Sequence, residues 1–190
     1  MSSNKVKFGI SNVYYAKMSV ANDGTITYGT PVAIPGAVSL SADPEGDTTP
    51  FYADNIVYYT SVSNNGYTGD LEVAMIPDTF LTDILGQDTD SNGAIFEANN
   101  DVNSQFALMF QIDGDKKNRR VVYYNVTAQR PSAEANTTED TKEPQTDTVS
   151  LTMAPRTSDK RVKAVMELTD DNQTAYNGFF SQVYEYTASV

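Results

Sequence analysis

Residues 51–86 read FYADNIVYYTSVSNNGYTGDLEVAMIPDTFLTDILG, and this stretch decides the fold because it predicts two strands and a short helix in succession. Ile56 to Ser63 is rich in β-branched and aromatic residues, and Asn64-Asn65-Gly66 follows with residues typical of a tight hairpin turn. From Tyr67 to Met75 the odd positions are mostly apolar, while the even positions begin polar. We therefore predict a hairpin between 56–63 and 67–75 whose second strand has one buried and one solvated face.

A short helix is predicted directly after that strand. Pro77 and Asp78 favour a helix start, and Gly86 stands where a helix ends. Between them, apolar residues recur at helical spacing: Phe80, Leu81, Ile84 and Leu85. Because so short a helix is unstable alone in water, we expect it to pack on the sheet.

Composition narrows the classes of function. The chain has 190 residues, with no cysteine and no histidine. It therefore has no disulfide framework and lacks the commonest general base and metal ligand. Its length fits a single domain, 1–190, because no linker separates two cores. No apolar run approaches the roughly 18 residues that cross a bilayer, and the N-terminus lacks a signal peptide's apolar core, so we expect no membrane association and synthesis in the cytoplasm.

Charge is distributed unevenly along the chain. The net charge is −12, and no Lys or Arg occurs from Met18 to Asp115, where fifteen acidic residues lie. From Lys116 to Lys163, ten basic residues accompany six acidic ones. The acidic total argues against a protein that wraps nucleic acid. The unlike halves either reflect ordinary variation between exposed loops or form opposite poles suited to head-to-tail association.

The remaining sequence predicts further strands, a second short helix and three irregular segments. Strands or extended runs are expected over residues 5–18, 25–28, 31–42, 105–112, 119–129, 146–154 and 161–168, and a helix over 174–182. The irregular segments are an exposed loop at about 43–54, a mobile loop at about 132–145 and a C-terminal arm at about 183–190. Phe51 and Tyr52 near the end of the exposed loop either form a partner surface or fold back onto their own domain.

Several predicted strands carry apolar or aromatic side chains on both faces. Strict alternation over 119–129 places Val122, Tyr124 and Val126 on one face, with Val121 and Tyr123 opposite. Three adjacent tyrosine pairs occur in predicted strands: Tyr14-Tyr15, Tyr58-Tyr59 and Tyr123-Tyr124. Because neighbours on a strand point to opposite faces, each pair puts rings on both sides of its sheet, which favours contact between subunits.

One stretch resembles part of a calcium loop. Residues 88–93, DTDSNG, place Asp88, Asp90 and Asn92 at ligand positions and a glycine at the sixth position. The twelfth position, where a bidentate Glu closes such a site, is Asn99. We therefore expect a polar turn without a metal, and these three residues are the candidates if a metal binds.

No catalytic constellation is apparent from the sequence. A Ser-His-Asp triad is impossible without histidine. The acidic pairs at 70/72 and 170/171 lie in strand and turn positions where solvated acids are common. We expect neither enzymatic activity nor a cofactor.

The order of several segments is similar to that of one known family. These segments are KVKFGISNVYYA (5–16), GYTGDLEVAMIPDTFLTDILG (66–86), FALMFQ (106–111), RRVVYYNVTAQRP (119–131) and EPQTDTVSLTMAPR (143–156). In this order the chain resembles the major tail tube proteins of siphophages, phages with long non-contractile tails, of the kind that infect Gram-positive bacteria. The resemblance implies a β-sandwich or barrel-like domain with a flanking helix, and hexameric rings stacked into a tube that carries DNA. Tubes of contractile tails and of type VI secretion share that core fold.

The resemblance also implies a virion protein whose partners are its own copies, a tape measure protein, and tail terminator or distal tail proteins. The outward face with Thr68, Asp70 and Glu72 then becomes the expected lumen wall, because a negative wall repels DNA, which carries one negative charge per ~1.7 Å. DNA is expected to pass without specific binding. Contacts between subunits or rings are expected at six aromatic residues: Phe51, Tyr52, Tyr14, Tyr58, Tyr123 and Tyr184.

Two other functions stay open at this point. A tyrosine-bearing β-sandwich is also typical of carbohydrate-binding modules, with the calcium-like turn at 88–93 as part of the site. A hydrolase of unknown type requires carboxylates that converge in a pocket.

Overall fold

An antiparallel sheet of ten strands forms the body of the subunit. The computed structural model describes residues 9–114, 118–132, 137 and 145–188. The body strands are β1 (Gly9–Val20), β2 (Ile26–Tyr28), β3 (Val32–Ala33), β4 (Ala37–Leu40), β5 (Asp43–Glu45), β8 (Gly66–Val73), β11 (Phe106–Asp113), β12 (Arg119–Ala128), β13 (Asp147–Met153) and β14 (Lys163–Met166). The other elements are β6 (Thr48–Ala53), β7 (Ile56–Val62), β9 (Asp88–Thr89), β10 (Ile95–Phe96) and the helices α1 (Asp78–Asp83) and α2 (Gln173–Asn177). The prediction of a mainly β fold with one flanking helix and a second near the C-terminus is confirmed.

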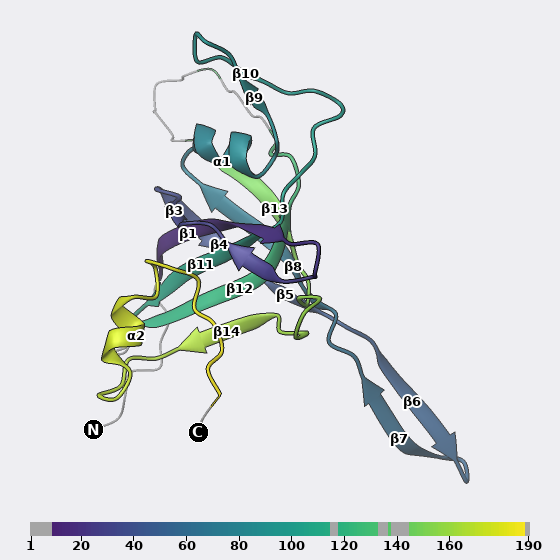
Figure 1. Cartoon of the computed structure of the whole chain (residues 1–190). Coiled ribbons are helices and arrows are strands. Elements are labelled where there is room, and N and C mark those ends of the chain that lie inside the picture. Colours follow the sequence, from purple (N-terminus) through teal and green to yellow (C-terminus); the bar gives the residue numbers. More distant parts are fainter. Residues whose placement is uncertain (1–8, 115–117, 133–136, 138–144, 189–190) are drawn as a thin grey trace.

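The body strands lie in the order β2-β1-β11-β12-β13-β8-β4. Three short strands extend this sheet: β3 pairs with β1, β14 with β12, and β5 with β8. The larger core cluster contains side chains from β1 together with side chains from β8 and β13, near the other end of the strand order. The sheet therefore curls around this cluster in a sandwich-like, barrel-like arrangement (Figure 1).

A second core cluster covers the outer face of β11 and β12. Alternate residues of β11 enter the two clusters: Phe106 and Leu108 the first, Ala107 and Met109 the second. The second cluster is covered by α2 and by Val183, so the chain's own C-terminal part supplies the outer layer. This layer explains why β11 and the first part of β12 are apolar on both faces.

The predicted alternation along β12 is wrong beyond Tyr124. Tyr124 enters the second cluster, whereas Val126 enters the first. The pairing with β11 gives the reason: Leu108 is opposite Tyr123, but Phe106 is opposite Val126, so β12 has one extra residue there. This β-bulge reverses which face each later residue occupies.

The predicted hairpin between 56–63 and 67–75 is also wrong in its pairing. β7 pairs with the preceding β6, and β8 pairs with β13, β4 and β5. The turn lies at Asp54 and Asn55, both with positive φ (50° and 61°), as a two-residue type I′ turn requires. Within β8, Leu71 and Val73 are buried as predicted, but Met75 beyond the strand is exposed.

The segment at 43–54 is exposed as predicted, but it is not a loop. It contains β5, which joins the body sheet, and β6, which forms half of a projecting hairpin. Asp47 and Ser63 close the base of this hairpin, because the Ser63 amide donates to the Asp47 carbonyl at 2.9 Å. The mixture of Asp, Pro, Gly, Glu and Thr at 43–50 is typical of a loop, so the sequence pattern does not indicate these strands.

Both predicted helices are present and short. Pro77 precedes α1, Gly86 follows it with φ +75°, and Phe80, Ile84 and Leu85 are buried as expected. The Tyr15 hydroxyl donates to the Asp83 carboxylate at 2.9 Å, which fastens α1 to β1. Within the described part of the chain, neither helix is long and apolar enough to span a bilayer.

Other predictions concern the ends of strands and the termini. The turn between β1 and β2 lies at Ala21 to Gly24, between the strands predicted at 5–18 and 25–28, with Gly24 at φ +84°. Most of the mobile loop predicted at 132–145 lies outside the described residues, as do 189–190 of the C-terminal arm.

Candidate assembly surfaces

The β6–β7 hairpin projects from the body of the subunit (Figure 1). Every residue of β7, and every residue of β6 except Ala53, is exposed. Seven large apolar side chains stand in water along it: Phe51, Tyr52, Ile56, Val57, Tyr58, Tyr59 and Val62. An isolated two-stranded hairpin is marginally stable in water, and exposed apolar patches of this kind mark interaction surfaces.

Strand pairing distributes these side chains over both faces of the hairpin. Phe51 pairs with Tyr59, and the next pair, Tyr52 with Val57, points to the opposite face. Tyr58 is the extra residue at this irregularity and is 71% exposed. A partner on one face alone therefore leaves rings uncovered on the other.

A second surface is polar and lies on β8 and its neighbours. Thr68, Asp70 and Glu72 alternate along β8 with residues of the inward face, of which Leu71 and Val73 are buried, so the three point away from the core. In β13 they stand opposite Thr152, Ser150 and Thr148. No Lys or Arg occurs in β4, β5, β8 or β13. The structure thus brings the three predicted lumen residues together on one face of carboxylates and hydroxyls, which we call the acidic face.

Hydroxyl groups hold the carboxylates of the acidic face in place. Thr146 and Ser39 donate to the two carboxylate oxygens of Glu72 at 2.7 and 2.9 Å, and Ser150 donates to Asp70 at 2.7 Å. Thr68 donates to Glu45 at 2.8 Å. The bond from Thr146, with that from Ser39, lowers the pKa of Glu72, because both stabilise its charged form. The face therefore stays negative at neutral pH.

The predicted tyrosine contacts divide into two groups. Tyr58 and Tyr59 are exposed, in agreement with a contact role. Tyr123 is only 4% exposed on the isolated chain, so little of its ring is open to a neighbour, and its place at a contact between subunits stays a prediction. The cover for its ring comes from its own chain, where it stacks on Phe110 with ring centroids 6.2 Å apart.

Tyr14 and Tyr184 are half-buried on their own subunit. Tyr14 stacks on Phe180, with ring centroids 5.1 Å apart, and Tyr184 stacks on Phe179 at 6.0 Å. The carbonyl of Tyr184 also accepts a hydrogen bond from the Tyr124 hydroxyl at 2.8 Å. Each ring thus has a partner within the chain and leaves only part of its surface for a neighbour.

A charged cluster fastens the C-terminal segment to the body. Arg156, which is buried, donates to both carboxylate oxygens of Glu185 at 2.7 and 2.9 Å. Its guanidinium also lies over the Tyr124 ring, 4.2 Å from the centroid. Burial acts to raise the pKa of Asp159, but hydrogen bonds from Arg156 and Arg161 outweigh it and hold that pKa well below its ordinary value. The segment up to Glu185 is therefore docked on its own subunit.

The calcium-like stretch is a turn whose carboxylate serves the backbone. It joins β9 to β10, and one Asp90 oxygen accepts the amides of Asn92 and Ala94, both at 2.8 Å. These bonds lower the pKa of Asp90, the one from Ala94 most. Asp88, Asp90 and Asn92 are all exposed, and the described residues contain no group of three or more His, Cys, Asp or Glu placed to hold a metal.

The body also carries an apolar groove of about 540 Å³ that the sequence did not predict. Residues of β1, β4, β8, β11, β12 and β14 line it, among them Val38, Leu40, Tyr67, Phe110, Val121 and Val165. Lys163 reaches over it, with its ammonium nitrogen 4.3 Å from the Tyr67 ring centroid. Because six strands from distant parts of the sequence contribute, no local pattern could have indicated it.

A second groove, of about 780 Å³, has a different character. Polar residues dominate its lining, and Arg130 at its edge pairs with Glu97 at 2.6 Å, both side chains being exposed. An exposed pair of this kind contributes little to stability. Leu85, Ala98 and Pro131 are the apolar residues of this lining, so the groove offers little apolar surface.

Comparison with known proteins gives one family. The family described as phage tail tube protein matches residues 1–179, which is most of the chain. The search of curated proteins found no match.

Proposed function

The chain belongs to the phage tail tube protein family, and from this premise we propose that it assembles into hexameric rings that stack into the tube of a long, non-contractile tail. Its role is thus structural, in the tail of the phage particle. The observation that carries the assembly proposal is the β6–β7 hairpin, which holds seven large apolar side chains in water. A patch of this size on a soluble subunit has a partner, and in a tube the partner at hand is another copy.

The acidic face is the wall of the lumen in this proposal. DNA carries one negative charge per ~1.7 Å, so a wall of fixed carboxylates repels it and offers no site for binding. Glu72 keeps its charge through hydrogen bonds from Thr146 and Ser39. Ser150 donates to Asp70, and β8 and β13 contain no Lys or Arg. Passage of DNA during ejection requires a wall that repels DNA rather than one that binds it.

In this proposal, the uneven distribution of charged residues along the chain gives the stacked rings a common orientation. Residues 18–115 carry no Lys or Arg, while 116–163 carry ten. Stacked rings repeat a head-to-tail contact, and opposite charges on the two sides of such a contact favour one orientation over its reverse.

The proposal further includes synthesis in the cytoplasm of a Gram-positive host, a tape measure protein inside the growing tube, and terminator or distal tail proteins at its ends.

Electron microscopy of concentrated purified protein tests the proposal. Wild-type protein is expected to form rings or tubes, alone or when seeded with tail components that start assembly. The double variant Phe51→Ala/Tyr52→Ala is expected to stay a folded monomer, because both residues are exposed and make no core contact. Phe96→Ala is the matched control, since Phe96 is exposed to a similar extent (56% against 60% for Phe51) but lies outside the hairpin.

Two results bear against the proposal. Wild-type protein that stays monomeric at every concentration, even with seeds, contradicts assembly into a tube. Unchanged tubes from the Phe51→Ala/Tyr52→Ala variant leave assembly standing but remove these two side chains as anchors.

A further inference from the structure

Two surfaces of the subunit have complementary properties and no partner within the described part of the chain. The hairpin is an apolar projection, and the apolar groove is a concavity of about 540 Å³ in the body. This volume lies within the range of pockets that enclose a drug-sized ligand, so it has room for a few side chains but not for the whole hairpin.

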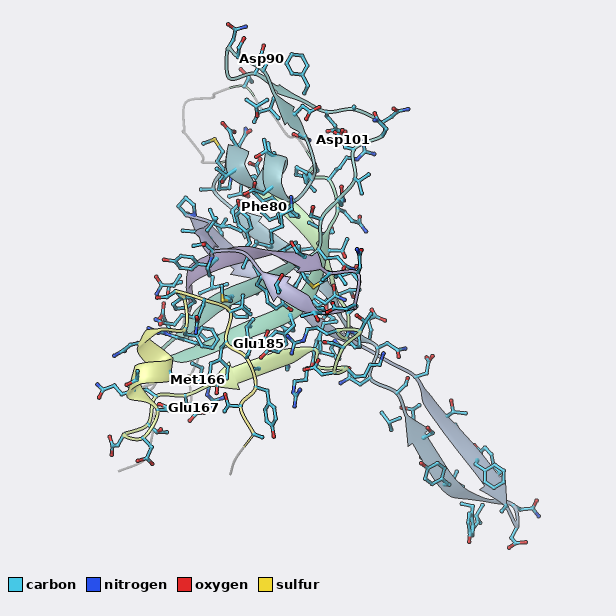
Figure 2. The ribbon with its side chains drawn as sticks, in the orientation of Figure 1. Phe80, Asp90, Asp101, Met166, Glu167 and Glu185 are labelled. Atoms are coloured by element: carbon cyan, nitrogen blue, oxygen red, sulfur yellow. The ribbon has the colours of Figure 1, made fainter. Side chains whose placement is uncertain are left out.

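The hairpin does not fill the groove of its own subunit. β6 and β7 point away from the sheet, and their side chains stay exposed (Figure 2). At about 3.3 Å per residue, the six residues of β6 carry the tip about 20 Å outward. That reach is enough to enter a neighbouring molecule.

Charge favours the hairpin as the occupant of the groove. The groove lining contains Lys163 and no acidic residue, and its other cation, Arg119, is already paired with Glu167 of the same chain. The hairpin contains Asp54 at its turn and no Lys or Arg. An acidic turn flanked by aromatic side chains thus suits a groove that is apolar inside and cationic at Lys163.

We propose that the tip of the β6–β7 hairpin, residues 52–58, seats in the apolar groove of a second copy of this chain. The inference rests on the self-assembly proposed above and names the surface that receives the hairpin. Because hairpin and groove are different surfaces of one subunit, each copy receives one hairpin and donates another. Such a contact is head-to-tail, and it propagates until a ring closes or continues as an open stack.

The first test places a charge in the groove. Val165→Asp is expected to abolish tubes, because a carboxylate there faces apolar side chains of the incoming hairpin. Val20→Asp is the matched control, since Val20 is equally exposed (54% against 53% for Val165) but lies outside the groove lining. Circular dichroism and thermal unfolding establish that both variants fold.

Mixing two variants that are each unable to form tubes tests whether the hairpin of one copy binds the apolar groove of another. Phe51→Ala/Tyr52→Ala retains the groove, and Val165→Asp retains the hairpin, so each has one intact half of the contact. Sedimentation velocity is expected to show monomers for each variant alone and complexes of two chains for the mixture. Monomers in the mixture contradict the proposed pairing.

Crosslinking between introduced cysteines tests the contact directly. The wild-type chain contains no cysteine, so only the introduced residues can react. Ile56→Cys in one preparation and Val165→Cys in another are mixed under assembly conditions and treated with a short bis-maleimide. A crosslinked dimer containing one of each is expected, and Val20→Cys in place of Val165→Cys is expected to give none. Dimers formed by Ile56→Cys alone show that hairpins meet each other, and they overturn the groove as the partner.

These outcomes are separable from failure of the proposed function. If wild-type tubes form and Val165→Asp tubes form equally well, the groove proposal is wrong while the tail tube role stands. If Val165→Asp lowers the thermal stability of the monomer but leaves tubes intact, the groove holds a segment of its own chain, such as residues 1–8, and the proposal is again wrong. Those residues contain Lys5 and Lys7 and no acid, which makes them the less suitable occupant.

Discussion

Two glycines fix how closely β8 approaches its neighbours. A Cβ atom on Gly66 would lie 2.0 Å from the carbonyl oxygen of Met153, and one on Gly69 would lie 2.1 Å from that of Ser41. Real Cβ atoms do not approach backbone oxygens so closely, so either substitution must push strands apart. Sequence analysis assigned Gly66 to a hairpin turn, whereas its importance comes from this close approach on the strand that carries the acidic face.

Gly66→Ala is expected to lower the free energy of unfolding by about 3 kcal/mol or more, because it combines a positive φ of 106° with the clash against Met153. Gly24→Ala is the matched control: its φ is +84°, but no atom lies within 4 Å of the added Cβ. The control is expected to lose only about 1–2 kcal/mol, the cost of a left-handed conformation. Urea unfolding measures both. Equal losses would show that the clash with Met153 contributes nothing.

At the scale of elements, alternation and helix signals predicted most of the fold. The inward residues of β8 and β13 and the start and end of α1 were predictable because each depends on a few neighbouring positions. The pairing of the strands was not predictable from sequence. Asn64-Asn65-Gly66 and Asp54-Asn55 both suit a tight turn, and only tertiary contacts decide which of them joins two paired strands. The β12 bulge and the apolar groove likewise depend on strands distant in sequence.

The acidic face was predictable from the sequence only in part. Its three β8 residues were predictable from the period of two, since Thr68, Asp70 and Glu72 alternate with apolar positions. The hydroxyl partners Ser39, Thr146 and Ser150 were not predictable as partners, because their contacts depend on strand register.

The hairpin is expected to contribute almost nothing to the stability of the monomer. Its side chains are exposed, and Asp47 and Ser63 already meet at its base, so a two-residue turn can replace residues 48–62. We expect an Asn-Gly replacement to unfold within a few degrees of the wild-type midpoint, since a deletion without buried contacts costs little. Scanning calorimetry gives that midpoint. A drop of 10 °C or more, beyond the shift of about 4 °C that 1 kcal/mol produces at this size, indicates that the hairpin packs on its own body.

For the whole molecule, the proposed association of subunits and the proposed passage of DNA place opposite demands on one surface charge. A net charge of −12 opposes contact between free subunits and repels DNA, whereas the proposed tube requires repeated contact between subunits. Apolar contact at a projecting hairpin resolves the conflict, because it does not depend on net charge. The carboxylates are then free to gather on β8, where four strands without Lys or Arg surround them.

Reversing the charge of the acidic face should convert a repelling lumen into a retaining one. Asp70→Lys/Glu72→Lys is expected to form tubes that hold short duplex DNA and protect it from DNase, with retention falling as salt rises because each Lys displaces a phosphate counterion. Wild-type tubes should hold none. Asp170→Lys/Asp171→Lys is the matched control, since it reverses the same number of exposed acids away from β8. DNA held by the control should remain sensitive to DNase, because it binds outside. If the double Lys tubes bind DNA only in a DNase-sensitive form, the acidic face lies on the exterior and β8 does not line the channel.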